Sequence, residues 1–335
     1  MTTLRTAFLA CLALAPLAAQ AQTHAPAEDR PGRVVLVPMS VERPAGAGWT
    51  LVRRTDTDLT FLHPADREHN SLVAIASGKG GVGKSTISTN LAVSLALDGA
   101  KVGVLDADIY GPSQQIMPGV PEDRRPEGRE GNFIVPIEAH GLQTMSMGYL
   151  VTEKTAMVWR GPMASSALQQ MITQTLWRDL DYLVVDMPPG TGDIQLTLAQ
   201  KAPVSGAVIV TTPQDIALLD CKKGIEMFAK VGIPVLGVVE NMAVHVCSHC
   251  GHAEHLFGAG GGERVAREYG VPLLGALPLD IRIREQTDGG KPTVAADPDG
   301  PLGSIYRDVA RRMGLEMLRR NAQQAQVPSI TVTND

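Results

Sequence analysis

The chain has 335 residues, with 30 lysines and arginines against 35 aspartates and glutamates, so its formal net charge is -5. This mildly acidic balance gives no electrostatic reason to expect a nucleic acid as partner. No apolar run beyond the N-terminus reaches the roughly 18 residues that a membrane-spanning helix needs, and the 4 cysteines are too few for a disulfide scaffold. We therefore expect a globular protein that binds neither nucleic acids nor membranes.

The first 22 residues have the pattern of an export signal. Arg5 precedes an apolar run that ends at Ala19, and the A-x-A triplet over residues 19–21 is typical of a cleavage site. Residues 23–70 are richer in proline, arginine and aspartate, and they contain two candidate short strands, "RVVLVPMSVE" and "WTLVRRTDTDLTFLH". We expect this second segment to be a linker or a small appendage, and we assign it no function.

From residue 71 to about residue 322 the sequence alternates between apolar runs and helical stretches. The runs are "LVAIAS", "KVGVLDAD", "YLVVDMPPG", "GAVIVTTPQD", "PVLGVVENM" and "PLLGALPL". Helices are expected at "STISTNLAVSLALDGA" and over residues 162–178, 194–200, 215–231 and 304–319. This alternation is typical of a mostly parallel sheet with helices on both faces, so we predict one α/β domain followed by a flexible tail over residues 323–335.

The first apolar run leads into a phosphate-binding loop. The segment "SGKGGVGKST" has the spacing G-x-x-x-x-G-K-[ST] between a strand and a helix, where backbone N–H groups and the helix N-terminus hold phosphate oxygens. This motif predicts a P-loop NTPase that binds ATP and Mg²⁺. Lys84 should reach the β- and γ-phosphates, and the Ser85 hydroxyl should bind Mg²⁺. The predicted nucleotide-binding residues of the loop are Gly78, Lys79, Gly80, Gly81, Val82, Gly83, Lys84, Ser85 and Thr86.

Polar residues at the ends of three other strands complete the predicted site. Asp186 takes the position of a Walker-B aspartate, which holds Mg²⁺ through water, and the N–H of Gly190 is expected to contact the γ-phosphate. Asp106 and Asp108 share one face of their strand. We assign Asp108 to orienting the attacking water and Asp106 to supporting Mg²⁺. The Asn241 amide is assigned to the adenine edge, with a plain turn residue as the alternative.

Taken together, these motifs resemble a known family. The loop "KGGVGKS", with Lys79 after the first glycine, is similar to the deviant Walker A loop of the MinD/ParA class of ATPases. The segments "DADIYGPS", "DMPPGTGD", "CSHCG", "FGAGGGE" and "PLDIRIREQTDGGKP" further resemble the Mrp/ApbC-type iron–sulfur cluster carriers, over residues 71 to about 320. The resemblance implies a homodimer in which Lys79 crosses to the partner's nucleotide, much as an arginine finger does. Many family members carry a small α/β domain before the ATPase, and residues 1–70 do not look like it.

Cys247 and Cys250 form a C-x-x-C pair shortly after the strand that ends at Asn241. A cubane [4Fe–4S] cluster takes four cysteines, so the cysteine count together with the resemblance implies a cluster that bridges two chains. Zinc is the alternative, because His252 and His255 would complete a Cys₂His₂ set within one chain. A pair of thiols that holds no metal is the third interpretation.

The resemblance implies an ATP-hydrolysing carrier that receives a cluster from an assembly scaffold and passes it to apo iron–sulfur proteins. Two other functions stay open at this point, a MinD/ParA-like positioning or partition ATPase and a zinc-stabilised nucleotide-binding module. Because ATP and reducing conditions belong to the cytoplasm, we expect a cytoplasmic protein. The signal-like residues 1–21 conflict with this expectation, unless translation starts later, for example at Met39, or the segment is a fused fragment.

Overall fold

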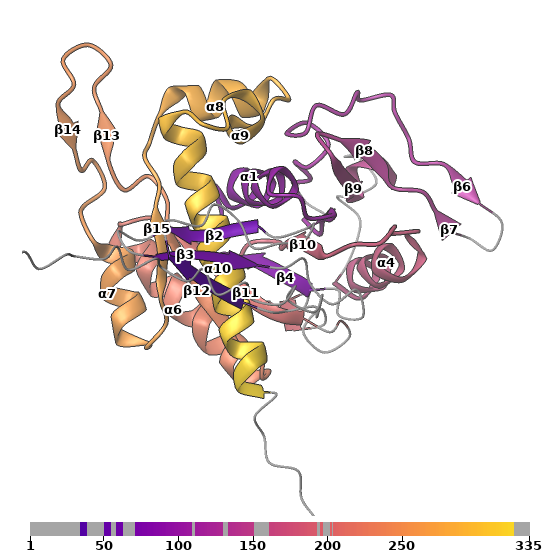
Figure 1. The fold of residues 1–335 in the computed structure, drawn as a ribbon. Helices are drawn as coiled ribbons and strands as arrows, with labels where there is room; N and C mark the ends of the chain where they lie inside the picture. Colours follow the sequence, from indigo (N-terminus) through magenta and orange to yellow (C-terminus); the bar gives the residue numbers. More distant parts are fainter. Residues whose placement is uncertain are drawn as a thin grey trace, which may run out of the picture.

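The structure is a computed structural model that describes residues 34–38, 50–54, 58–62, 71–108, 111–129, 133–150, 161–192, 195–196, 202 and 204–324. Its centre is an eight-stranded sheet with the strand order β15-β12-β11-β4-β10-β5-β9-β8 (Figure 1). All neighbouring strands in this sheet are parallel except β8 and β9. The predicted α/β fold with a mostly parallel sheet is therefore confirmed.

The strands of the sheet are β4 (Ser71–Ala76), β5 (Val102–Asp106), β8 (Ile137–Ala139), β9 (Leu142–Ser146), β10 (Tyr182–Asp186), β11 (Val204–Thr211), β12 (Val235–Glu240) and β15 (Leu273–Ala276). The described helices are α1 (Lys84–Leu97), α2 (Met147–Leu150), α4 (Gly161–Gln174), α6 (Asp215–Lys230), α7 (Gly261–Glu268), α8 (Ile281–Asp288), α9 (Thr293–Ala296) and α10 (Pro301–Gln324). None of these helices is both long enough and apolar enough to cross a lipid bilayer.

The sheet separates two apolar cores, because successive side chains of a strand point to opposite faces. On one face Val73 and Ile75 of β4 pack with residues of α1 and α10, among them Leu91 and Met313. On the other face the neighbouring residues of β4 pack with α4, α6 and α7. Both faces are thus covered by helices (Figure 1), which is why the central strands read as continuous apolar runs rather than as alternating ones.

Helix α1 is buried along most of its length, and its polar residues are held by internal hydrogen bonds. The Ser94 hydroxyl donates to the Asn90 carbonyl four residues earlier, and the Ser88 hydroxyl shares its hydrogen between the Lys84 carbonyl and the Asp186 carboxylate. The side-chain oxygen of Asn90 accepts from the backbone N–H of Val294 in α9, at 2.9 Å. The sheet lies on one side of this helix and α9 and α10 lie on the other, so the helix has no exposed polar face. This packing fixes the position of its N-terminus, which is where the phosphate loop ends.

Two smaller sheets and a short arm lie outside the central sheet. The candidate strands before residue 71 are found as β1 (Val34–Pro38), β2 (Thr50–Arg54) and β3 (Asp58–Leu62), in an antiparallel sheet of order β1-β3-β2. The second of the two predicted runs therefore forms two paired strands rather than one. β6 (Gly128–Arg129) and β7 (Phe133–Ile134) pair in the arm, and β13 (His245–Val246) and β14 (Ala253–Glu254) form a hairpin that projects from the body (Figure 1).

The edge of the central sheet was not predicted. β8 and β9 are joined through His140 and Gly141, which both have positive φ, at 48° and 75°. Two such residues make a tight hairpin turn, but His-Gly is a weaker sequence signal than Asn-Gly. The predicted helix over residues 194–200 and the segments 1–22 and 325–335 lie largely or wholly outside the described residues.

Candidate functional site

The phosphate loop connects the end of β4 to the start of α1. Gly81 and Gly83 have φ values of 79° and 82°, a left-handed conformation that glycine adopts without steric cost. The loop borders a cavity of about 250 Å³, which is also lined by Asp108, Met117 and Pro189 from other parts of the chain. The carboxyl ends of β4, β5 and β10 therefore meet at one cavity, as expected for a ligand site in a parallel sheet.

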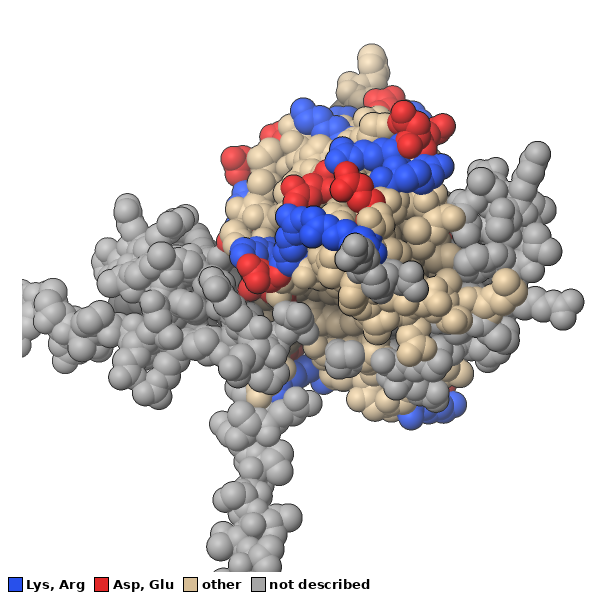
Figure 2. Space-filling model, turned by 90° about the vertical axis from the view of Figure 1, so that its right-hand side faces the viewer, with Lys and Arg blue, Asp and Glu red and all other residues tan. Residues whose placement is uncertain are grey.

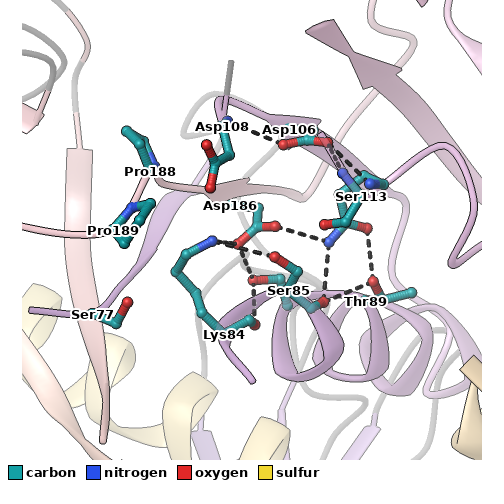
Figure 3. A network of polar contacts seen from close by, with 12 residues as sticks. Ser77, Lys84, Ser85, Thr89, Asp106, Asp108, Ser113, Asp186, Pro188 and Pro189 are labelled. Atoms are coloured by element: carbon teal, nitrogen blue, oxygen red, sulfur yellow. Dashed lines mark hydrogen bonds and ion pairs between the residues drawn. The ribbon is translucent and has the colours of Figure 1, made fainter. Parts of the chain in front are cut away.

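Lys84 forms a buried ion pair with Asp186 at the bottom of this site (Figure 3). Its ammonium lies 2.5 Å from Oδ1 of Asp186 and 3.3 Å from the Ser85 hydroxyl. The Ser88 hydroxyl donates to the same carboxylate oxygen at 3.0 Å. The predicted Walker lysine and Walker-B aspartate are thus in contact, and a phosphate that enters the cavity would compete with Asp186 for the lysine.

The oxygen ligands of the site fit Mg²⁺ bound together with a nucleotide. Ser85 lines the cavity, and the Asp186 carboxylate lies beside it through their shared contact with Lys84. Among the residues that the structure describes, no group of three or more His, Cys, Asp or Glu side chains is placed to hold a metal ion. Mg²⁺ is commonly bound by one or two protein oxygens plus phosphates and water, so this donor set suits Mg²⁺ on a nucleotide rather than an all-protein cage.

The carboxylate of Asp106 is held by the chain that follows β5, and its predicted support of Mg²⁺ stays a prediction. Asp106 is fully buried, and its carboxylate accepts hydrogen bonds from the backbone N–H groups of Asp108, Ser113 and Gln114 and from the Ser146 hydroxyl, at 2.9–3.1 Å. Burial, and then the charge of Asp186, raise its pKa to about 7. Asp106 thus organises the loop that follows β5, whereas Asp108 on that loop borders the cavity.

Gly190 and Asn241 hold the phosphate loop from two sides. The N–H of Gly190 donates to Ser77 O at 2.9 Å, and its predicted contact with the γ-phosphate stays a prediction. The amide nitrogen of Asn241 donates to Val82 O at 2.9 Å, and this side chain is buried. This contact braces the loop and was missed from the sequence, while the adenine contact of Asn241 stays a prediction.

Lys79 is exposed at the rim of the cavity. Its carbonyl accepts a hydrogen bond from the Ser77 hydroxyl at 2.9 Å, which fixes the loop backbone at this point. The neighbouring Gly78 is packed against α6, where an added Cβ would lie 2.1 Å from Asp220 O. The backbone that carries Lys79 is therefore held in place while its side chain faces outward.

The C-x-x-C pair lies in the turn of the β13–β14 hairpin. The N–H of Cys247 donates to His252 O at 2.9 Å, and the N–H of Gly251 donates to Cys247 O at 2.8 Å, so the turn is closed by backbone hydrogen bonds. Cys250 is exposed and Cys247 is partly exposed. Hydrogen bonds from the backbone N–H groups of Cys250 and His249 lower the pKa of the Cys247 thiol, which favours the thiolate that binds metals.

The histidines of the zinc alternative are not gathered around the two thiols. His255 Nδ1 lies 2.7 Å from Ala243 O at the base of the hairpin. In the described part of the chain, no three of the four candidate ligands come together to hold a metal ion; these are Cys247, Cys250, His252 and His255. Within one chain, the hairpin thus presents two thiols without the two further ligands that a tetrahedral zinc site needs.

The phosphate loop lies between a central parallel strand and a buried helix, and a Walker-B aspartate ends the adjacent strand. This arrangement defines the protein as a P-loop NTPase. It belongs to the ParA family, because the model described as "NUBPL iron-transfer P-loop NTPase" matches residues 68–314. The resemblance inferred from the motifs is therefore confirmed.

Relatives of known name agree with this assignment. An iron-sulfur cluster carrier protein of Pseudomonas fragi is 66% identical over 244 residues, which cover 73% of this chain and 85% of the relative. The protein of the same name from Escherichia coli K12 is 61% identical over 247 residues, covering 74% of this chain and 67% of the relative.

Solved structures are similar across the same domain. A nucleotide-binding protein from Archaeoglobus fulgidus, in complex with ADP, matches with a TM-score of 0.61 at 34% identity and covers 71% of this chain and 92% of its own. The cell-division ATPase MinD of Pyrococcus furiosus matches with a TM-score of 0.58 at 25% identity, covering 74% and 99%.

Proposed function

We propose that this protein is an ATPase that carries an iron–sulfur cluster as cargo between two copies of the chain and delivers it to apo iron–sulfur proteins. The observation that carries the proposal is the hairpin turn with Cys247 and Cys250, which offers two accessible thiols and is joined by no third His, Cys, Asp or Glu ligand among the residues that the structure describes. A [4Fe–4S] cluster needs four thiolates, and two copies supply 2 × 2 = 4. The names of the relatives, iron-sulfur cluster carrier proteins, support the same cargo.

ATP hydrolysis is assigned to the cavity beside the phosphate loop. Lys84 and the loop N–H groups would hold the phosphates, Ser85 and Asp186 would hold Mg²⁺, and Asp108 would orient the attacking water. Mg²⁺ supplies charge stabilisation on the phosphate oxygens when it is bound. The exposed Lys79 is assigned to the nucleotide of the second copy, so that hydrolysis depends on the homodimer.

The cellular setting follows from this chemistry. We assign the protein to the cytoplasm, where ATP is available and thiolates stay reduced, with a cluster assembly scaffold as donor. On the face shown in Figure 2, lysine and arginine side chains lie among aspartates and glutamates rather than in a patch of one sign. Neither the mixed charge of this face nor the net charge of -5 favours a nucleic acid or an anionic membrane as partner.

Anaerobic reconstitution with iron and sulfide tests the proposal. We expect about four irons and four sulfides per dimer, the stoichiometry of one bridging cubane, in a species of twice the chain mass by light scattering. An apo ferredoxin of the [4Fe–4S] class should then gain the cluster absorption that the carrier loses. One tightly bound zinc per chain, with no iron uptake and no dimer, would instead establish the zinc-stabilised module.

A further inference from the structure

Gln114 lies between the two buried carboxylates of the nucleotide site. It is fully buried. Its backbone N–H donates to Asp106 Oδ2 at 2.9 Å, and its side-chain amide donates to Asp186 Oδ2 at 3.1 Å. Because Asp106 and Asp186 face each other in register on β5 and β10, one residue of the loop after β5 holds the ends of both strands.

The side-chain amide also contacts the first turns of α1. Its nitrogen donates to Ser85 O at 3.0 Å, and its oxygen accepts from the Thr89 hydroxyl at 2.7 Å. A carboxylate and a carbonyl can only accept, so the amide nitrogen must face Asp186 and Ser85, and the oxygen must face Thr89. The orientation of the buried amide is therefore fixed by all three contacts.

The contact with Asp186 matters most when Lys84 changes partner. Asp186 Oδ1 accepts from Lys84 and Ser88, whereas Oδ2 accepts from Gln114. A lysine that turns to the phosphates gives up its ion pair, and the carboxylate then depends on the remaining donors for its orientation. In the described part of the chain Gln114 is not hydrogen-bonded to Lys84, so it can keep Asp186 in place through this exchange.

We propose that Gln114 is a positioning residue for ATP hydrolysis. It holds Asp186 in the orientation that Mg²⁺ requires, and it locks the loop that carries Asp108 against the start of α1. The inference rests on the proposed ATPase activity. This role was not predicted from the sequence, because glutamine in this loop belongs to no phosphate-binding motif.

The test compares Gln114→Leu with Gln115→Leu. Gln115 is a matched control on the same loop, since its amide is partly exposed and donates to Pro121 O and Glu122 O at 3.3 Å, away from the carboxylates. The readouts are kcat and KM for ATP over a range of Mg²⁺ concentrations, and the gain in ADP affinity on adding Mg²⁺, by calorimetry. Circular dichroism and urea unfolding verify that each variant is folded.

For Gln114→Leu we expect kcat to fall about tenfold or more, because a hydrogen bond to a charged group is lost. KM for ATP at saturating Mg²⁺ should change less than about twofold, and the Mg²⁺-dependent gain in ADP affinity should shrink at least about threefold. Gln114→Asn, whose amide is one methylene short of Asp186, should show the same losses, and it takes over the test if the leucine variant is unfolded. Gln115→Leu should match the wild type in all three quantities.

A folded Gln114 variant with wild-type kcat and wild-type Mg²⁺ dependence would overturn the inference, as would equal losses in Gln115→Leu. An increase in KM with kcat unchanged would also overturn it, because that pattern reports uniform binding. A wild-type protein that hydrolyses no ATP would contradict the proposed function itself. The effect of Mg²⁺ on ADP affinity would still decide the role of Gln114 in that case.

Discussion

Lys84 and Asp186, 102 positions apart in the sequence, form an ion pair that is almost completely shielded from solvent. The pair joins the start of α1 to the end of β10 and so links the two halves of the nucleotide site. Removing one partner of a buried pair leaves an uncompensated charge, which costs more than the pair itself contributes.

Lys84→Met should therefore lower the free energy of unfolding by about 3 kcal/mol and abolish tight ADP binding. Adding Asp186→Asn should recover part of the stability, because the buried charge is then removed, but it should not recover ADP binding. Urea unfolding and calorimetry measure the two effects. A Lys84→Met variant as stable as the wild type would contradict this account of the pair.

Lys79→Ala should leave ADP affinity within about twofold of the wild type and remove ATP turnover. The reason is that Lys79 faces outward from the loop, where it is assigned to the partner's nucleotide. Mixed dimers of Lys79→Ala with Asp108→Ala chains contain one site with both groups intact, and they should regain activity. No regained activity in mixed dimers verified by native mass spectrometry would argue against action across the interface.

Asn241→Ala separates the brace on the phosphate loop from the predicted adenine contact. If the amide acts through Val82 O, the affinities for ADP and for pyrophosphate, which has no base, should fall by the same factor of about three to ten. Calorimetry with Mg²⁺ present measures both affinities, and we expect the pyrophosphate affinity to fall because the brace is lost. A loss confined to ADP would establish the adenine contact instead.

The pKa of Asp106, raised from 3.8 to about 7, predicts how stability depends on pH. Between these two values the folded chain holds a proton that the unfolded chain has released, so the contribution of Asp106 to the free energy of unfolding falls as the pH rises from about 4 to about 7. Asp106→Asn should thus be less destabilising at pH 8 than at pH 5, by about 1 kcal/mol or more. Urea unfolding at the two pH values is the measurement, and an equal cost at both would refute the raised pKa.

Cys247→Ala and Cys250→Ala should each abolish cluster binding, because a bridging site then loses two thiolates per dimer. ADP affinity should stay within about twofold, since the hairpin projects away from the body that holds the phosphate loop (Figure 1). His252→Ala and His255→Ala are the controls and should keep the cluster. Iron analysis after anaerobic reconstitution distinguishes these variants, and iron loss in the histidine variants alone would exclude a four-thiolate site.

The parts of the site that the sequence predicted are those with a local pattern. The P-loop spacing and the apolar run that ends at Asp186 depend only on neighbouring residues, so the phosphate loop and the Walker-B strand were placed correctly. The contact of Asn241 with Val82 joins residues 159 positions apart. Such contacts depend on strand order, and no local pattern encodes the order β11-β4-β10-β5.

The hydrogen bonds of Asp106 and Gly190 were not predicted for a related reason. Asp106 and Asp108 looked equivalent because strand periodicity puts both on one face. The structure separates them, since the chain turns after β5 and its N–H groups fold back onto Asp106. Likewise, no sequence pattern predicts an acceptor within the chain for the N–H of Gly190. The packing of its loop against Ser77 provides one.

The exposed hairpin also has a chemical consequence. A surface thiolate is the form that attacks peroxides and becomes a sulfenic acid, and the lowered pKa of Cys247 increases its thiolate fraction. Cys250 lies three residues after Cys247 in the same turn and is also a free thiol, so a sulfenic acid formed on one of them has a resolving thiol nearby. Brief exposure of the cluster-free protein to dilute hydrogen peroxide should thus yield a Cys247–Cys250 disulfide, with water as the leaving group of the sulfenic acid. Mass spectrometry detects this disulfide, and a dithiol reverses it. The same turn that offers the thiols to an acceptor would then also protect them from irreversible oxidation.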